Sequence, residues 1–264
     1  LLEARRRAGG RAGTHADPWR ANLGPHALYT GTALWDWLRV RGLHGPARMP
    51  ASPRIALRWE GAVTTVPPRA LRRAIVGLRG VEAPVDRDLR GWATDRWGPE
   101  VARAMAGAAS ALTFDHDPGR LSAAFVVERI RRILLRPVPA ARYVDGGWSA
   151  LVDRLVGHAR RAGVALDLDA RVDAGDLDDV RRRGPVIVAV GPTAARRLLG
   201  DDAAPDDERR VALLDVGLVR RRRTPYLVVD LDGPSFTTRP SAVLGSVAPS
   251  GHDLLQMSAG MCPG

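Results

Sequence analysis

A carboxylate, several guanidinium groups and a pair of glycines lie within residues 1–11 of the chain. Glu3 follows an apolar pair, Leu1 and Leu2, that is typical of the end of a buried strand, where a carboxylate can accept both hydroxyl hydrogens of a ribose. The adjacent Gly9 and Gly10 would let backbone N–H groups approach a pyrophosphate. Taken alone, the same residues are also what a flexible loop contains, so other motifs have to decide.

Three other groups of residues could do chemistry but fit an ordinary structural role better. Ser149 lacks the second glycine of a nucleophile elbow and has no assignable His and Asp partners, so we expect it to cap a helix. Asp167, Asp169 and Asp173 begin like a calcium loop, but valine stands where glycine is required, which favours solvated strand ends. The segment 115–117, Asp-His-Asp, could ligate a metal, yet the Pro-Gly that follows it favours a surface turn.

The composition limits the classes of function that remain. The chain has 264 residues, 45% hydrophobic and 26% charged, and lacks the stretch of about 20 apolar residues that a membrane helix needs. Its formal charge is +11, but all 40 basic residues are arginine, in short scattered clusters with few aromatic neighbours, so we expect no nucleic-acid partner. The single cysteine, Cys262, permits no internal disulfide, and a cytoplasmic location is expected.

The hydrophobic pattern predicts the elements that must position these residues. Apolar spacing predicts a helix over residues 27–41, and alternation around a Glu-Gly turn predicts a β-hairpin over residues 54–66. Residues 69–136 are predicted to be mostly helical, with breaks at Gly-Pro and Asp-Pro-Gly. This half of the pattern therefore indicates helices together with one hairpin.

The pattern changes after this helical stretch. A helix is predicted over residues 149–162, followed by a strand over residues 164–168 and a short strand at Val172. The apolar run 186–190 is bounded by Gly-Pro pairs, which predicts a central strand covered on both faces. A short helix over residues 194–199 and strands within residues 211–231 and 236–247 complete the prediction.

Five segments, in this order, resemble landmarks of the flavin-dependent amine oxidases, protoporphyrinogen oxidases and phytoene desaturases. The first is the family's Glu-x-Arg-x-x-x-Gly-Gly-Arg signature, which matches Glu3, Arg5, Gly9, Gly10 and Arg11. The second, Asn22–Tyr29, resembles the family's Gly-Pro-His turn, and the third, Tyr143–Trp148 with Leu151, resembles its Gly-Gly segment. The fourth, Arg171–Val172, resembles its adenine-contacting strand, and the fifth, Val188–Pro192, resembles its returning central strand.

The resemblance implies an α/β fold in which a partial Rossmann-like FAD-binding domain of the glutathione-reductase type is interwoven with an α+β substrate domain. It assigns residues 1–26 and 143–200 to the FAD-binding domain. Residues 27–142, mostly helical with a β-hairpin, and residues 201–264 are assigned to the substrate domain. We expect the chain to be a fragment, because it begins inside a strand and lacks the family's G-x-G-x-x-G loop and C-terminal FAD segment.

The same resemblance implies roles for individual residues around FAD. Glu3 would hold the adenosine ribose, and Val172 would contact the adenine through its backbone. For His26, contact with the flavin and a purely structural role in the turn are equal alternatives. The phosphate region would be bound by Arg5, Gly9, Gly10 and Arg11, and the flavin would be lined by Gly24, Pro25 and His26.

The implied activity is that of an oxidoreductase in which the flavin takes a hydride from a small apolar organic substrate. Many amine oxidases of the family use a lysine near the flavin, and this chain contains none, which favours the phytoene-desaturase-like branch of dehydrogenases and isomerases. No catalytic acid or base is assigned. A peripheral membrane contact could deliver such a substrate. The alternative is a non-catalytic relative that keeps the fold without binding flavin.

Overall fold

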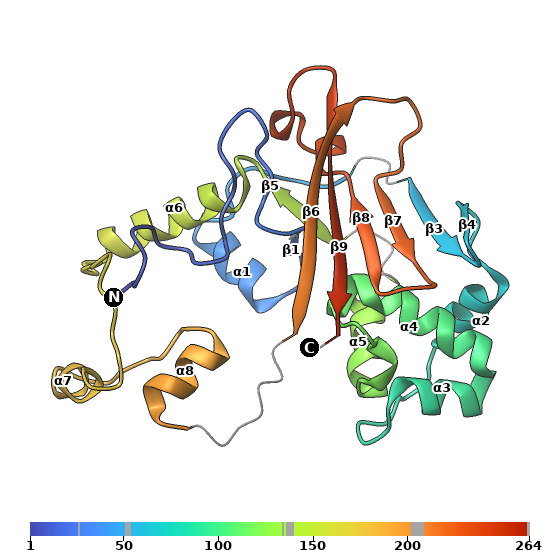
Figure 1. Ribbon diagram of the computed structural model, residues 1–264, viewed down its shortest axis with the longest axis horizontal. Helices are drawn as coiled ribbons and strands as arrows, with labels where there is room; N and C mark the ends of the chain where they lie inside the picture. Colours follow the sequence, from blue (N-terminus) through green and yellow to red (C-terminus); the bar gives the residue numbers. More distant parts are fainter. Residues whose placement is uncertain (26, 51–53, 134, 136–139, 202–208, 263–264) are drawn as a thin grey trace.

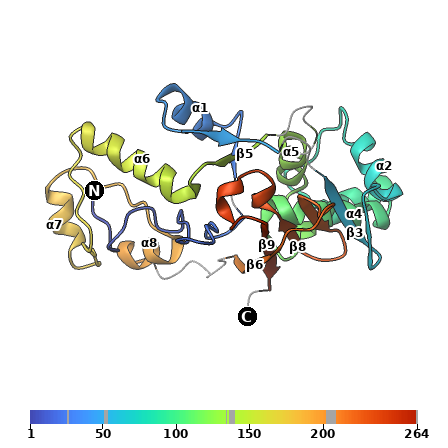
Figure 2. The same ribbon diagram turned by 90° about the horizontal axis from the view of Figure 1, so that it is seen from above.

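Two sheets and a group of helices make up the protein, and a computed structural model describes residues 1–25, 27–50, 54–133, 135, 140–201 and 209–262. The helices α6, α7 and α8 lie with the N-terminus at one end of the molecule, and α2 and α4 lie with β3 at the other (Figures 1 and 2). None of the helices in these ranges is long and apolar enough to cross a membrane. His26 lies outside the described residues.

The larger sheet is mixed and has the strand order β4-β3-β7-β8-β9-β6. Strands β3 and β7 pair in parallel, and the other neighbours pair antiparallel. The predicted hairpin at 54–66 is confirmed as β3 and β4, joined at Glu60 and Gly61, which both have positive φ. The strands are β3 (Ile55–Trp59), β4 (Ala62–Thr64), β6 (Arg210–Val219), β7 (Leu227–Asp230), β8 (Ser235–Thr238) and β9 (His252–Met261).

The C-terminal strand prediction was only partly right. Strand β7 lies within the predicted range 211–231 and β6 begins one residue before it, but β8 ends at Thr238 and two 3₁₀ turns follow it, η2 (Pro240–Ala242) and η3 (Gly245–Val247). Pro240 has no N–H to donate to a sheet ladder, so the strand cannot continue through it. Strand β9, the neighbour of β6 over its whole length, was not predicted.

Helices cover the end of this sheet and confirm the helical prediction for residues 69–136. Their shared core consists of alanine, valine, leucine, one tryptophan, one methionine and one isoleucine, and it includes fully buried Leu89, Val101 and Met105. Pro99 starts the longest of them, where its missing N–H costs nothing. The elements are α2 (Arg69–Gly77), α3 (Leu89–Trp97), α4 (Pro99–Thr113), η1 (Pro118–Arg120) and α5 (Ala123–Ile133).

A small three-stranded sheet joins the two ends of the molecule, with order β1-β5-β2. Its strands are β1 (Leu28–Tyr29), β2 (Ala47–Arg48) and β5 (Ala141–Val144), and α6 (Gly147–Arg161) follows β5 directly. The predicted helix 27–41 is shorter, since α1 (Ala33–Val40) begins only after Thr32, whose hydroxyl accepts from the Trp35 N–H. The predicted helix 149–162 is confirmed as α6, with Gly163 beyond its end at φ +81°.

The prediction of strands in residues 164–190 was wrong except for one bridge. Leu2 forms an isolated parallel bridge with Asp167, whereas neither Val172 nor residues 186–190 lie in a strand. Ile187 is 91% exposed, so the apolar run is not covered on either face. A central strand needs a partner on each edge, and no described residue supplies one here. Two short helices complete this region, α7 (Leu177–Arg182) and α8 (Pro192–Leu199), and α8 confirms the helix predicted at 194–199.

Gly107 in α4 and Gly157 in α6 should respond with opposite signs to the same substitution. A Cβ at Gly107 would lie 2.5 Å from the Cα and carbonyl oxygen of Leu231, so Gly107→Ala is expected to destabilise the protein by about 1–3 kcal/mol. A Cβ at Gly157 meets only the flexible end of Arg161, so Gly157→Ala should stabilise by about 0.5–1 kcal/mol. Urea midpoints of the two variants test this, and equal shifts would contradict the close approach of α4 to Leu231.

Candidate functional site

The predicted nucleotide segment lies beside residues 165–170. Parallel hydrogen bonds join the two, from Glu3 N–H to the Asp167 carbonyl and from Ala170 N–H to the Glu3 carbonyl, both at 2.9 Å. The half-buried Glu3 carboxylate accepts the Arg5 N–H at 2.9 Å through one oxygen. Its other oxygen has no hydrogen-bond partner among the described residues, so it can accept from a ligand.

The two predicted glycines differ in their surroundings. Both have positive φ, +108° at Gly9 and +54° at Gly10, so a side chain would strain the backbone at either position. Gly9 also packs on α6, where a Cβ would lie 2.8 Å from a methyl group of Val152, whereas Gly10 has open space in place of a side chain. Gly9 therefore seats the loop on α6, and Gly10 leaves the backbone accessible.

Asn22, the only asparagine of the chain, connects the N-terminal loop to α6 and to the larger sheet. Its side-chain oxygen accepts the Trp148 N–H at 3.0 Å, and its carbonyl accepts the Gln256 side chain at 2.9 Å. Thr14 and Ser149 add a reciprocal pair, in which each backbone N–H donates to the other hydroxyl at 2.9 and 3.1 Å. The prediction that Ser149 caps a helix was wrong, because Gly146 is the N-cap of α6 and Ser149 lies inside its first turn. The free N–H groups of that turn are satisfied by Asn22 and Thr14, and the Ser149 hydroxyl holds the N-terminal loop in return.

A cavity of about 360 Å³ lies next to this junction, between the larger sheet and the helices. The strand registers place Ile55, Leu57, Leu227, Val229, Phe236 and Thr238 on one sheet face, and all six line the cavity. The opposite wall comes from α2, α4 and α5, and a third wall comes from β1 and β5. Pro25, in the predicted flavin turn, also lines it, so the cavity reaches the N-terminal loop.

All three tyrosines of the chain, Tyr29, Tyr143 and Tyr226, line this cavity. The hydroxyl oxygens of Tyr143 and Tyr226 are 2.5 Å apart. Burial raises the pKa of Tyr143 to about 12, and burial followed by the neighbouring Tyr143 raises the pKa of Tyr226. Burial also raises the pKa of Tyr29. The three hydroxyls therefore stay protonated at neutral pH and can donate hydrogen bonds, but they cannot serve as bases.

The solved structures that resemble the chain share its fold at low sequence identity. A protein from Pyrococcus furiosus aligns with 98% of this chain and 72% of its own, at 16% identity and a TM-score of 0.74. An oxidoreductase from Methanosarcina mazei aligns with 99% and 73%, at 10% identity and a TM-score of 0.64. Cyclohexylamine oxidase from Brevibacterium oxydans aligns with 98% and 69%, at 13% identity and a TM-score of 0.63. No family model and no curated protein matches the sequence.

The chain has an amine-oxidase-like fold. The α/β fold class predicted from the sequence is thereby confirmed, and the resemblance to flavin-dependent oxidoreductases holds at the level of fold. The same fold also aligns with 99% of this chain in a Rab GDI from Plasmodium falciparum, at 10% identity and a TM-score of 0.55. That protein is not named as an oxidoreductase, so the fold by itself does not decide the reaction.

Within the amine-oxidase-like fold, the predicted site residues form two groups. Glu3 and Arg5 lie at the end that contains Ala170, two residues before the half-buried Val172. Gly24 is buried with φ +114°, next to Pro25 at the cavity. The Gly9–Arg11 loop lies between Arg5 and Gly24 in sequence, and Gly9 holds it against α6. His26 lies outside the described residues.

Sequence reasoning missed the hydroxyl-bearing residues of the cavity. Tyr29 and Tyr143 lie inside segments that matched family landmarks, but nothing in either segment indicated a role for them. Tyr226 directly precedes β7 and Thr238 ends β8, and neither residue carries a local motif. The one available signal was scarcity, since two of only three tyrosines lie within matched segments.

The segment 115–117 and a hollow along α5 do not contribute to this site. Asp115 forms ion pairs with Arg120 at 3.2 Å and Arg209 at 3.0 Å, and no group of three or more metal-binding side chains occurs in the described ranges.

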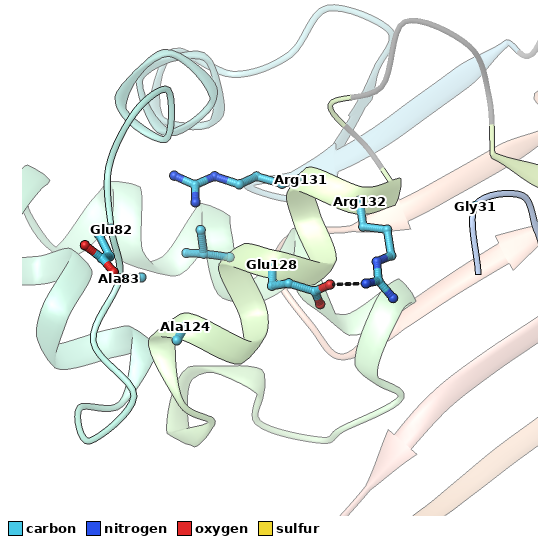
Figure 3. Close-up of a pocket in the computed structure, with 8 residues that line it drawn as sticks. Gly31, Glu82, Ala83, Ala124, Glu128, Arg131 and Arg132 are labelled. Carbon is cyan, nitrogen blue, oxygen red and sulfur yellow. Dashed lines mark ion pairs between the residues drawn. The ribbon is translucent and has the colours of Figure 1, made fainter. Parts of the chain in front are cut away.

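An open hollow of about 510 Å³ lies along α5, with Glu128 paired to Arg132 at 2.8 Å (Figure 3). The Arg131 guanidinium beside them donates to backbone carbonyls, including that of Leu78 at 2.6 Å. These charges are satisfied within the protein.

Proposed function

We propose that the chain binds FAD and acts as an oxidoreductase on an apolar substrate, as a phytoene-desaturase-like dehydrogenase or isomerase. The observation that carries this proposal is the apolar cavity, whose lining includes Pro25 of the turn that resembles the family's flavin turn. A cavity of about 360 Å³ falls within the range of roughly 300–1,000 Å³ that is typical of small-molecule sites. The fold shared with an oxidoreductase and with cyclohexylamine oxidase supports the same reaction class.

The residues at the N-terminal end fit the adenosine diphosphate half of FAD. Glu3 has a carboxylate oxygen without a partner in the described part of the chain, and Gly10, further along the same loop, has positive φ and open space in place of a side chain. Arg5 and Arg11 are exposed on the same loop and supply positive charge for phosphates. When bound, FAD would supply the hydride acceptor. The chain's own residues would bind the adenosine end, orient the substrate and exclude water from the cavity.

One observation favours the alternative of a non-catalytic relative. The run 186–190, expected as a central strand of the FAD-binding half, is unpaired and largely exposed. A visible spectrum of the purified chain separates the two hypotheses. Flavin bands that appear on purification, or after FAD is added and excess removed, support the oxidoreductase. A colourless protein that leaves added FAD unbound contradicts it.

Glu3→Ala is expected to weaken FAD binding by about 10-fold or more, because a charged hydrogen bond to the ribose is lost. The change should leave FMN binding unaltered, since FMN lacks the adenosine ribose. Titration of each flavin, followed by the quenching of its fluorescence, measures both constants. Glu128→Ala, on the far side of the molecule in a surface ion pair, is the matched control. Equal loss of FMN and FAD affinity would mean that Glu3 acts through stability instead.

A further inference from the structure

We propose that the cavity selects an uncharged ligand with an apolar body and one hydroxyl or carbonyl group. This inference deepens the proposed function and rests on it only in taking the cavity as the substrate site. Two observations carry it: the cavity lining contains no charged side chain among the described residues, and it contains hydroxyl groups whose hydrogen-bonding capacity is unused.

The absence of charge from the described part of the lining argues against an ionic ligand. The described residues that line the cavity include no acid, arginine, histidine or carboxamide. Arg129 does not line the cavity, and its guanidinium lies 5.0 Å from the Phe125 ring centre. Its charge opposes the rise that burial causes in the pKa of Tyr29. An ammonium or carboxylate ligand would thus lose its hydration without gaining a paired counter-charge from the described lining residues, which is costly.

The hydroxyl groups supply the polar contact that a neutral ligand can use. Thr238 is only 6% exposed, and its hydroxyl has no hydrogen-bond partner in the described structure. In the Tyr143–Tyr226 pair, one hydroxyl donates to the other, so one O–H hydrogen remains for a further acceptor. A buried hydroxyl without a partner is unfavourable, and a ligand that hydrogen-bonds to it recovers that free energy.

The aromatic side chains favour a body with flat apolar surface. Phe114 and Phe236 meet edge to face with ring centroids 5.4 Å apart, and both line the cavity. Aromatic pairs of this geometry accept further rings at an edge or an offset face. Naphthalene derivatives are therefore suitable probes, because one ring system can carry a hydroxyl, an ammonium or a carboxylate group.

The test compares four probes on the full chain: naphthalene, 2-naphthol, 2-naphthoate and 2-naphthylmethylammonium. We expect 2-naphthol to bind about 3- to 10-fold more tightly than naphthalene, as one neutral hydrogen bond predicts. Both ions should bind at least about 30-fold more weakly than 2-naphthol. Dissociation constants from probe fluorescence measure this series. Binding of either ion as tight as that of 2-naphthol would overturn the proposal.

Thr238→Val tests the hydroxyl itself, because valine keeps the shape and removes the O–H. The variant should lose most of the preference for 2-naphthol over naphthalene and keep its affinity for naphthalene. The control is Thr237→Val, because Thr237 directly precedes Thr238 in β8 and faces the opposite side of the sheet. Its preference for 2-naphthol over naphthalene should equal that of the wild type. Because the Thr238 hydroxyl has no partner, its removal should not lower the melting temperature. The double variant Tyr143→Phe/Tyr226→Phe, which removes both hydroxyls of the pair, is the second test and is expected to reduce the same preference.

The result is separable from that of the FAD experiment. If the chain binds FAD but shows no preference for 2-naphthol, and neither Thr238→Val nor the Tyr143→Phe/Tyr226→Phe double variant changes the probe constants, the cavity inference fails while the proposed function stands. If 2-naphthol binds in a Thr238-dependent way but FAD does not bind, the cavity inference stands and the oxidoreductase proposal fails.

Discussion

Replacing Asp253 with alanine is expected to lower the free energy of unfolding by about 3–5 kcal/mol, because it removes the counter-ion of a largely buried arginine. The Asp253 carboxylate is 1% exposed and accepts from Arg239 at 3.0 Å, from Arg220 at 3.3 Å and from the Ser241 hydroxyl at 3.0 Å. Arg239 follows the end of β8, Arg220 follows the end of β6, and Ser241 lies in η2, while Asp253 lies at the start of β9. One carboxylate therefore holds together the ends of β6 and β8 and the start of β9.

Urea denaturation of the Asp253→Ala protein measures this loss. The matched control is Asp95→Ala, in which an aspartate 70% exposed loses an ion pair of 2.6 Å with Arg87. Exposed pairs contribute only about 0–1 kcal/mol, so the control should barely change the midpoint. Similar losses in the two variants would show that burial of Asp253 does not determine its contribution.

The elements that the sequence predicted correctly are those specified by local patterns. The hairpin at 54–66 and the helices within 69–136 have their own turns, breaks and apolar faces, and both are present. Strand β9 was missed because its buried side chains include Asp253, Gln256 and Ser258, which are polar and break the hydrophobic alternation.

The opposite error occurred at residues 186–190, where a strong local pattern did not suffice. An apolar run of β-branched residues has high strand propensity, but a strand exists only when neighbouring strands bond to it. In the described residues this run has no such neighbour, and Ile187 remains 91% exposed. Propensity could be derived from the sequence, whereas strand pairing could not.

The candidate site shows the same difference between local sequence patterns and tertiary contacts. The segment Glu3–Arg11 can be proposed from the sequence because its residues are contiguous and follow a recognisable order, and its role in binding FAD stays a prediction. The cavity could not, since its walls come from many separate elements and the Tyr143–Tyr226 contact joins residues 83 apart in sequence. Neither tyrosine has a local neighbour that would indicate the other. Such a site follows only from the tertiary packing of β5 against the larger sheet.

Asp115→Ala should have a comparably large effect, about 3–5 kcal/mol, and should also weaken probe binding in the cavity. Asp115 is fully buried and pairs with Arg209 at the start of β6 and Arg120 at the end of η1. The preceding residue, Phe114, is in the left-handed region at φ +55° and lines the cavity. Loss of the carboxylate should release this turn and the ring of Phe114. Urea midpoints and 2-naphthol titration measure the two effects, and a variant that keeps both would contradict this account of Asp115.

The same carboxylate should make stability fall in acid. Burial alone would raise the pKa of Asp115, but the Asp117 N–H and the Arg120 guanidinium outweigh burial and hold the pKa below its ordinary value. A carboxyl of this kind contributes stability above its unfolded pKa of about 3.9, and that contribution is lost as pH falls through the lower folded-state pKa. Asp115→Asn removes the titration. Its urea midpoint should therefore lie below that of the wild type at neutral pH and fall less steeply below about pH 4, whereas parallel pH profiles would assign the acid sensitivity to other carboxylates such as Asp253.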